Sequence, residues 1–141
     1  MLELINTAPQ TVAVNDAVVY NDVYVKGGCA EYHRAGTGTI TLMKAGRYKV
    51  AFSANVAVPA TGAVADGIKL AIAQDGEPLI GTVMASTPSL VSTLNNVSTE
   101  TYIDVPQCCG HACCSHITIE NVGVQAADVE NANFIAVRVN G

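Results

Sequence analysis

The chain has 141 residues, of which 50% are hydrophobic and 13% are charged, and its formal net charge is −5. This composition excludes a disordered chain, and the length suits one domain over residues 1–141 with a single core. The negative charge and the lack of a basic cluster exclude non-specific nucleic-acid binding. No apolar run approaches the roughly 20 residues of a membrane-spanning helix, so no membrane partner is expected. So low a charge content suggests that other subunits cover part of the surface.

The first residues do not resemble a secretory signal peptide. Met1–Ile5 carries Glu3 where a basic region is needed, and the apolar stretch is too short. We therefore expect synthesis in the cytoplasm without a signal peptide. Residues 1–14 form a lead-in segment, which Pro9 interrupts. Residues 11–14 suit a strand at a sheet edge.

Two strands are predicted before residue 44. Residues 18–25 alternate, with one face of valines and a second face that carries Tyr20, Asp22 and Tyr24. Residues 29–33 form a short extended piece in which Glu31 and His33 share a face; most such groups are solvated edges, so no catalytic role is assigned to them. Residues 39–43 predict the second strand.

The longest alternating stretch is residues 45–58, AGRYKVAFSANVAV. Successive side chains of a strand point to opposite faces, so one face of this stretch is apolar and buried. That face comprises Tyr48, Val50, Phe52, Ala54, Val56 and Val58. A strand of this length is expected to be central to a sheet.

Asp75-Gly76 lies between two alternating runs and predicts a tight hairpin, because both central turn positions favour positive φ. Its return strand is expected over residues 78–84. Further strands are predicted at residues 97–105, around Ile117 and Ile119, and at residues 133–139, while residues 126–132 are the only candidate for a helical turn. About eight to ten strands separated by turn residues indicate an all-β antiparallel sandwich or barrel.

Several of these features resemble the C1q/TNF-like jelly roll. The pattern Gly46-x-Tyr48-x-Val50-x-Phe52, the Asp-Gly hairpin and an apolar C-terminal strand are similar to that family, which includes the C-terminal domain of the spore-surface glycoprotein BclA. The whole chain also resembles small proteins of gut Firmicutes and their prophages. That closer resemblance is carried by the opening residues 4–12, by Asp75-Gly76-Glu77-Pro78-Leu79, by Val105-Pro106 followed by two cysteines, and by Asn131-Ala132-Asn133.

The resemblance implies a homotrimer with the C-terminal strand near the three-fold axis. Phe134 and Ala136 lie on the second face of that strand, opposite Ile135, Val137 and Val139. A trimer would bury this second apolar face, so Phe134 and Ala136 are the predicted interface residues. In the alternative interpretation, Phe134 caps the edge of the core.

The most unusual segment is residues 108–116, CCGHACCSH, with four cysteines and two histidines. Thiolates and imidazoles suit Zn²⁺, and the candidate ligands are Cys109, His111, Cys113 and His116. The usual signature of two ligand pairs separated by a longer loop is absent. The alternative is disulfide bonding.

The disulfide candidates are Cys29, Cys108, Cys109, Cys113 and Cys114. Cys29 is remote from the other four and is the natural partner for one of them. Five cysteines leave one unpaired, which indicates a free thiol or an intersubunit bond. Reduced cysteines packed as small hydrophobic residues are the third alternative.

No catalytic set, phosphate loop or dinucleotide fingerprint is recognisable, so an enzyme is not expected. Tyr20, Tyr24, Tyr32 and Tyr102 fall on expected outer faces and form a candidate ligand surface, although such residues also suit strand packing. The leading hypothesis is a trimeric structural protein on the surface of a phage or prophage particle, a decoration or fibre-head module that contacts capsid or other virion proteins. The alternatives are a module that binds a host glycan or receptor, and a structural protein of a bacterial spore or cell surface.

Overall fold

The predicted central strand is present in the computed structural model, which describes residues 1–109, 111–112 and 114–140. It forms β6 (Gly46–Ala57), an interior strand that is paired on both sides within a sheet. The six residues of its predicted apolar face are all buried: Tyr48, Val50, Phe52, Ala54, Val56 and Val58. The period-two pattern therefore identified both the strand and its inner face.

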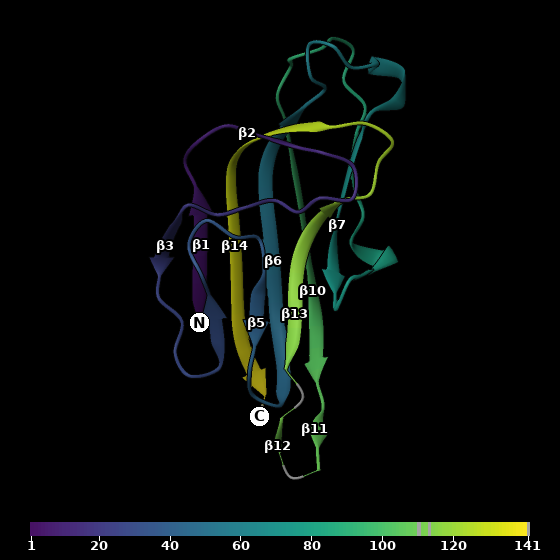
Figure 1. Ribbon diagram of the computed structural model, residues 1–141. Helices are drawn as coiled ribbons and strands as arrows, with labels where there is room; N and C mark the ends of the chain where they lie inside the picture. The colour runs from purple at the N-terminus through teal and green to yellow at the C-terminus, as the bar shows by residue number, and fades with distance from the viewer. Residues whose placement is uncertain (110, 113, 141) are drawn as a thin grey trace.

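The first sheet has the strand order β10–β6–β14–β1–β3, and β2 also pairs with β14. Its strands pair antiparallel (Figure 1). In chain order they are β1 (Leu2–Asn6), β2 (Gln10–Val12), β3 (Asp22–Val25), β6, β10 (Asn95–Val105) and β14 (Ala127–Asn140). The first and last strands of the chain are thus neighbours in the centre of the fold.

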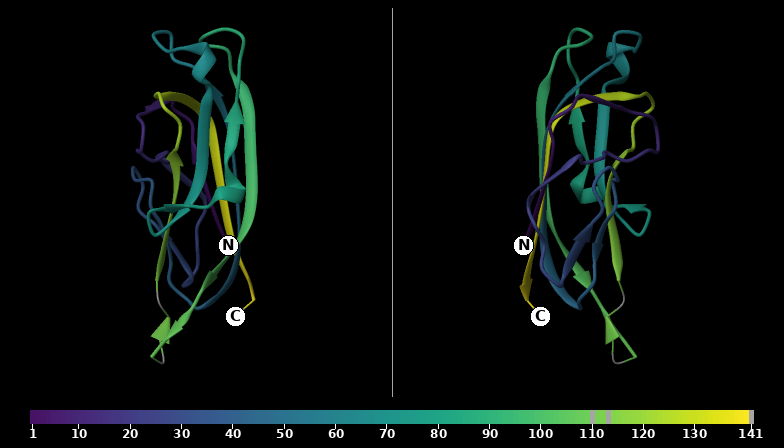
Figure 2. Two further views of the ribbon diagram at one scale, coloured as in Figure 1. Left: turned by 90° about the vertical axis from the view of Figure 1, so that its right-hand side faces the viewer. Right: turned by 60° about the vertical axis from the view of Figure 1, so that its left-hand side comes forward.

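The second sheet has the order β4–β5–β13–β7–β8, and β9 also pairs with β7. In chain order its strands are β4 (Glu31–His33), β5 (Ile40–Leu42), β7 (Ile68–Gln74), β8 (Glu77–Pro78), β9 (Met84–Ser86) and β13 (Ser115–Asn121). The two sheets lie face to face (Figure 2), with one hydrophobic cluster between them. The architecture is an all-β antiparallel jelly roll, as predicted.

The Asp-Gly hairpin joins β7 to β8. Asp75 has φ 52° and Gly76 has φ 86°, the two positive angles that the turn requires. The predicted return strand is interrupted, because a 3-10 turn at Ile80–Thr82 separates β8 from β9. Thr82 is buried in this turn, and its hydroxyl accepts a hydrogen bond from the Ile72 amide at 3.0 Å.

Two local predictions are wrong. Residues 126–132 form no helical turn, because β14 begins at Ala127 and continues through this stretch with an irregularity at Asn131, whose φ is 54°. The strand predicted over residues 18–25 is formed only from Asp22 onwards. The preceding residues cross to the second sheet, where the Val18 amide donates a hydrogen bond to the Ile119 carbonyl at 2.8 Å. Tyr20 is therefore buried in the core and does not lie on an outer face.

A small two-stranded unit extends beyond the sandwich. It consists of β11 (Gln107–Cys108) and β12 (His111–Ala112), which pair antiparallel. In Figure 1 it lies below both sheets, beyond the end of β10. None of the described residues forms a helix long and apolar enough to span a membrane.

Candidate functional site

The outer face of the first sheet has no covering layer in the single chain. Its central strands carry aliphatic side chains outward at half-buried positions: Ile5 on β1, Ala51 on β6, and Ile135 and Val137 on β14. The register places Ile135 opposite Ala51 of β6, whereas its partner on β1 is Glu3. Val137 pairs with Lys49, and Ile5 pairs with Asn133. We call these four residues, together with the half-exposed Val139, the aliphatic strip.

Phe134 and Ala136, the predicted interface residues, lie on the inner face of β14. Phe134 and Ala136 are fully buried within the single chain, where Phe134 lies against Tyr20 with ring centroids 5.9 Å apart. They belong to the core of the sandwich and are not available to a second subunit. Ile135 and Val137 are the residues that face outward.

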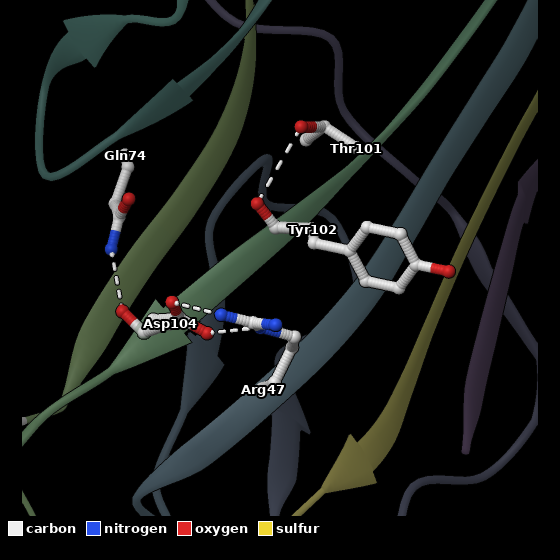
Figure 3. Close-up of polar contacts among 5 residues, drawn as sticks. All are labelled: Arg47, Gln74, Thr101, Tyr102 and Asp104. Carbon is white, nitrogen blue, oxygen red and sulfur yellow. Dashed lines mark hydrogen bonds and ion pairs between the residues drawn. The ribbon is translucent and has the colours of Figure 1, made fainter.

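Charged and polar groups border the aliphatic strip on the β10 side. Lys49 forms an ion pair with Glu100 at 3.5 Å. Nearer the end of β10, Arg47 and Asp104 make two parallel contacts, Nε to Oδ1 at 2.7 Å and Nη2 to Oδ2 at 2.9 Å (Figure 3). The guanidinium of Arg47 lowers the pKa of the Asp104 carboxyl, and the carboxylate raises the pKa of Arg47. These two exposed ion pairs join the outward side chains of β6 to those of β10.

Asp104 also links the two sheets at this end. Gln74 of β7 donates from Nε2 to the Asp104 carbonyl at 3.4 Å and to the Ser115 hydroxyl at 3.2 Å. Figure 3 shows Gln74 reaching the β10 backbone beside the Arg47–Asp104 pair. Tyr102 lies on the same strand, and its side chain is exposed.

The four tyrosines proposed as a ligand surface lie on separate segments of the chain, and one of them is buried. Tyr24, Tyr32 and Tyr102 are exposed, as expected, but they belong to β3, β4 and β10 respectively. Tyr20 is completely buried, and its hydroxyl has no hydrogen-bond partner among the described residues. Burial raises the pKa of Tyr20 well above its ordinary value.

The cysteines divide into bonded and free groups. Cys108, on β11, is disulfide-bonded. Cys29, Cys109 and Cys114 are free and exposed, so the proposed pairing of Cys29 within the chain is not formed. Cys113 lies outside the described residues.

The proposed zinc ligands are only partly described. Cys109 is a free thiol, and His116 is exposed with Nδ1 3.2 Å from the Thr41 hydroxyl. Cys113 falls outside the described residues, as does the side chain of His111. Among the side chains that are described, no group of three or more His, Cys, Asp or Glu residues is arranged to hold a metal. The zinc site stays a prediction.

Comparison with known proteins identifies the fold. No protein-family model and no curated protein matches the chain. Among solved structures, the globular domain of zebrafish complement 1qA aligns with a TM-score of 0.69 at 14% identity, over 98% of this chain and 95% of that one. Murine APRIL aligns with a TM-score of 0.64 at 13% identity, over 98% and 97% of the two chains. The PRD1 vertex protein P5 aligns with a TM-score of 0.55 at 17% identity, over 99% and 96%. The chain therefore has a C1q/TNF-like jelly-roll fold.

Sequence reasoning missed the aliphatic strip. Its signal was present in Ile135 and Val137, but both faces of that strand are apolar, so alternation alone could not decide which face lies inward. Pairing with β1 decides it, because Leu2 and Leu4 lie opposite Ala136 and Phe134 and are buried with them.

Proposed function

We propose that this chain is a non-enzymatic structural protein that assembles as a homotrimer through the outer face of its first sheet. Its place is the surface of a phage or prophage particle, as a decoration or fibre-head module. The proposed partners are two further copies of the chain, and capsid or other virion proteins.

The observation that carries this proposal is the aliphatic strip. Ile135 and Val137 lie on the strand that occupies the centre of the first sheet, Ala51 pairs with Ile135 on one side, and on the other side Ile5 lies two residues along β1 from Glu3, the partner of Ile135. Burying such a surface is favourable by about 25 cal/mol for each Å² of apolar area. A C-terminal strand near a three-fold axis, which the family resemblance implies, would bring the strips of three chains together.

The location on a particle is supported by the fold comparison and by the resemblance of the sequence to prophage proteins. One of the aligned structures is a vertex protein of the phage PRD1, and the alignment spans almost the whole of both chains. Fold likeness at this level of identity leaves the biological role open. The assignment therefore needs a direct test.

The test is to induce prophages in the source cells and to separate particles from free protein on a density gradient. We expect the chain to sediment with the capsid protein, and antibody-linked gold to label the particle surface. Recovery only in spore or cell-wall fractions would overturn the phage assignment and favour the surface-protein alternative. Neighbouring capsid and portal genes would support the phage assignment, whereas coat or exosporium genes would oppose it.

A second candidate function is binding of a host glycan or receptor. The exposed side chains of Tyr24, Tyr32 and Tyr102 favour it, because an exposed aromatic ring offers a flat apolar surface with a polar edge. Screening on a glycan array tests it. Saturable binding that single Tyr→Ala substitutions abolish would establish the function, and an array without signal would reject it for glycans.

A further inference from the structure

A cavity of about 360 Å³ opens at the edge of the sandwich where β3 of the first sheet approaches β4 of the second. Its size is within the range of small-molecule sites. Part of its wall is apolar, and this part comprises Leu2, Val23 and Met43, while Tyr32 of β4 also borders the cavity. The polar part comprises Lys26, Glu31 and His33, and the backbone of Gly27 and Gly28 completes the lining.

Glu31 is the one charged residue among the buried residues of the described chain. Its side chain is 2% exposed, and its ion-pair partner is the Met1 ammonium, at 3.4 Å and with a side chain that is half exposed. Charge-assisted hydrogen bonds between ammonium and carboxylate are shorter, about 2.7–2.9 Å. Because burying a carboxylate is costly unless it is well paired, a donor that approaches Glu31 more closely than the Met1 ammonium would stabilise it.

His33 offers a second acceptor. Its Nε2 lies 2.9 Å from the Thr37 carbonyl, which only accepts, so Nε2 carries the proton of this hydrogen bond. In the neutral ring Nδ1 is then an acceptor. Nδ1 is buried and has no hydrogen-bond partner among the described residues. A buried acceptor that the chain itself leaves unpaired needs an explanation, and a donor supplied from outside the chain is one.

The two acceptors belong to one site. Glu31 and His33 are two residues apart on β4, so their side chains leave the same face of the strand, with Cα atoms roughly 7 Å apart. Gly27 holds the facing loop against this strand, because a Cβ at Gly27 would lie 2.7 Å from the Glu31 carbonyl oxygen. The loop therefore packs directly on the backbone of the strand that carries both acceptors.

We infer that this cavity binds a primary amine with a small apolar body. The ammonium donates hydrogen bonds to the Glu31 carboxylate and the His33 Nδ1, displacing the distant Met1 ammonium, and the alkyl or aryl body packs on Leu2, Val23 and Met43. A metal ion fits less well, because the described residues supply two ligands here and no third.

The site is separate from the aliphatic strip, so its test does not depend on the proposed trimer. The experiment compares n-pentylamine with 1-pentanol, which has nearly the same shape but no charge, by titration calorimetry on the full chain. We expect the amine to bind with a Kd on the order of 1 mM or tighter, and the alcohol at least about tenfold more weakly. Equal affinities, or no saturable binding of the amine, would overturn the inference.

Matched variants locate the site. Glu31→Gln removes the charge but keeps the size of the side chain, and we expect it to weaken amine binding at least about tenfold. Glu77→Gln makes the same chemical change in the exposed β7–β8 turn and should leave binding unchanged. His33→Phe keeps the aromatic ring next to Tyr20, from which His33 lies 5.8 Å, and should also weaken binding. Unchanged binding in Glu31→Gln would contradict the site.

If Glu31→Gln does not fold, a measurement on the unmodified protein can still test the site. Amide chemical shifts recorded during the amine titration should move at Gly27, Gly28 and Tyr32, which line the cavity. Shifts confined to the aliphatic strip or to other surfaces would overturn the inference.

Discussion

Phe134 shows how a single side chain can belong to the core or to an interface. It is fully buried in the isolated chain and packs beside Tyr20. Since the cavity left by a buried phenylalanine is only partly filled by relaxation, we expect Phe134→Ala to lower the free energy of unfolding by about 3–5 kcal/mol. Chemical denaturation at a fixed protein concentration measures this loss.

The matched control is Tyr24→Ala, which removes an aromatic ring that is 71% exposed and should change stability by less than about 0.5 kcal/mol. If Phe134→Ala were as stable as the unmodified protein but no longer formed the oligomer, Phe134 would be an interface residue after all.

The Arg47–Asp104 pair makes a prediction about pH. The pKa of Asp104 is lowered, first by its hydrogen bonds from Arg47, so the pair favours the folded state above the ordinary pKa of an aspartate. That contribution is lost as the pH falls through the lowered pKa of the folded state. Because both side chains are exposed, its effect on stability is small. We expect the carboxyl carbon of Asp104 to titrate below the ordinary range in an NMR experiment.

A variant without the guanidinium shows how much of the lowered pKa of Asp104 is due to Arg47. In Arg47→Gln the titration midpoint of Asp104 should rise towards the ordinary value. Identical midpoints in the two proteins would show that Arg47 is not the cause of the shift.

At the scale of elements, the β7–β8 hairpin depends on positive φ angles. Gly76 has φ 86°, and a Cβ at this position would meet no atom within 4 Å, so conformation alone opposes a larger residue. We expect Gly76→Ala to destabilise the fold by about 1–2 kcal/mol. Thermal unfolding of the variant beside the unmodified chain measures this.

Gly81 provides the control, because it is equally open but does not have a positive φ. Gly81→Ala lies in the 3-10 turn and should be neutral or slightly stabilising. Equal destabilisation by the two substitutions would show that turn geometry does not explain the effect at Gly76.

The β11–β12 hairpin makes a prediction about cysteine chemistry. Cys108 is disulfide-bonded, whereas Cys29, Cys109 and Cys114 are exposed thiols. Alkylation of the native protein followed by peptide mapping should label these three residues before reduction and Cys108 only after it. If a chelator is needed before Cys109 reacts, the zinc site proposed from the sequence gains support in place of the free thiol.

The sequence predicted elements well wherever one face alone is apolar. The strand β6 carries Lys49 and Ser53 opposite Tyr48 and Phe52, so its inner face was unambiguous. In β14 both faces are apolar, and Phe134 was placed at the interface although its ring fills the core. Tyr20 was misplaced for a different reason, because backbone hydrogen bonds of Val18 and Tyr20 to other segments of the chain take this stretch out of the first sheet. Such long-range pairing leaves no local signal.

The cavity was partly visible in the sequence. Glu31 and His33 were recognised as sharing one strand face, but most such pairs are solvated. Their burial depends on Leu2 and Met43, which come from other parts of the chain and meet them only in the folded structure. The polar side chains of the site could therefore be recognised from the sequence, whereas their burial in a cavity could not.

At the scale of the whole molecule, the account predicts that a charge in the aliphatic strip disrupts assembly. Val137→Lys would place an unpaired ammonium in the interface, which is costly to bury, and should weaken association at least about tenfold. Val83→Lys makes the same change at an exposed valine beside the second sheet and should assemble normally. Light scattering coupled to size-exclusion chromatography compares the two. Equal assembly of both variants would place the interface elsewhere.

The most direct test of the central claim is sedimentation equilibrium of the unmodified protein at micromolar concentration. We predict one species with three times the mass of the chain, and this trimer should not dissociate on dilution through the micromolar range. A single species with the mass of one chain would contradict it, because the aliphatic strip would then have no subunit to cover it.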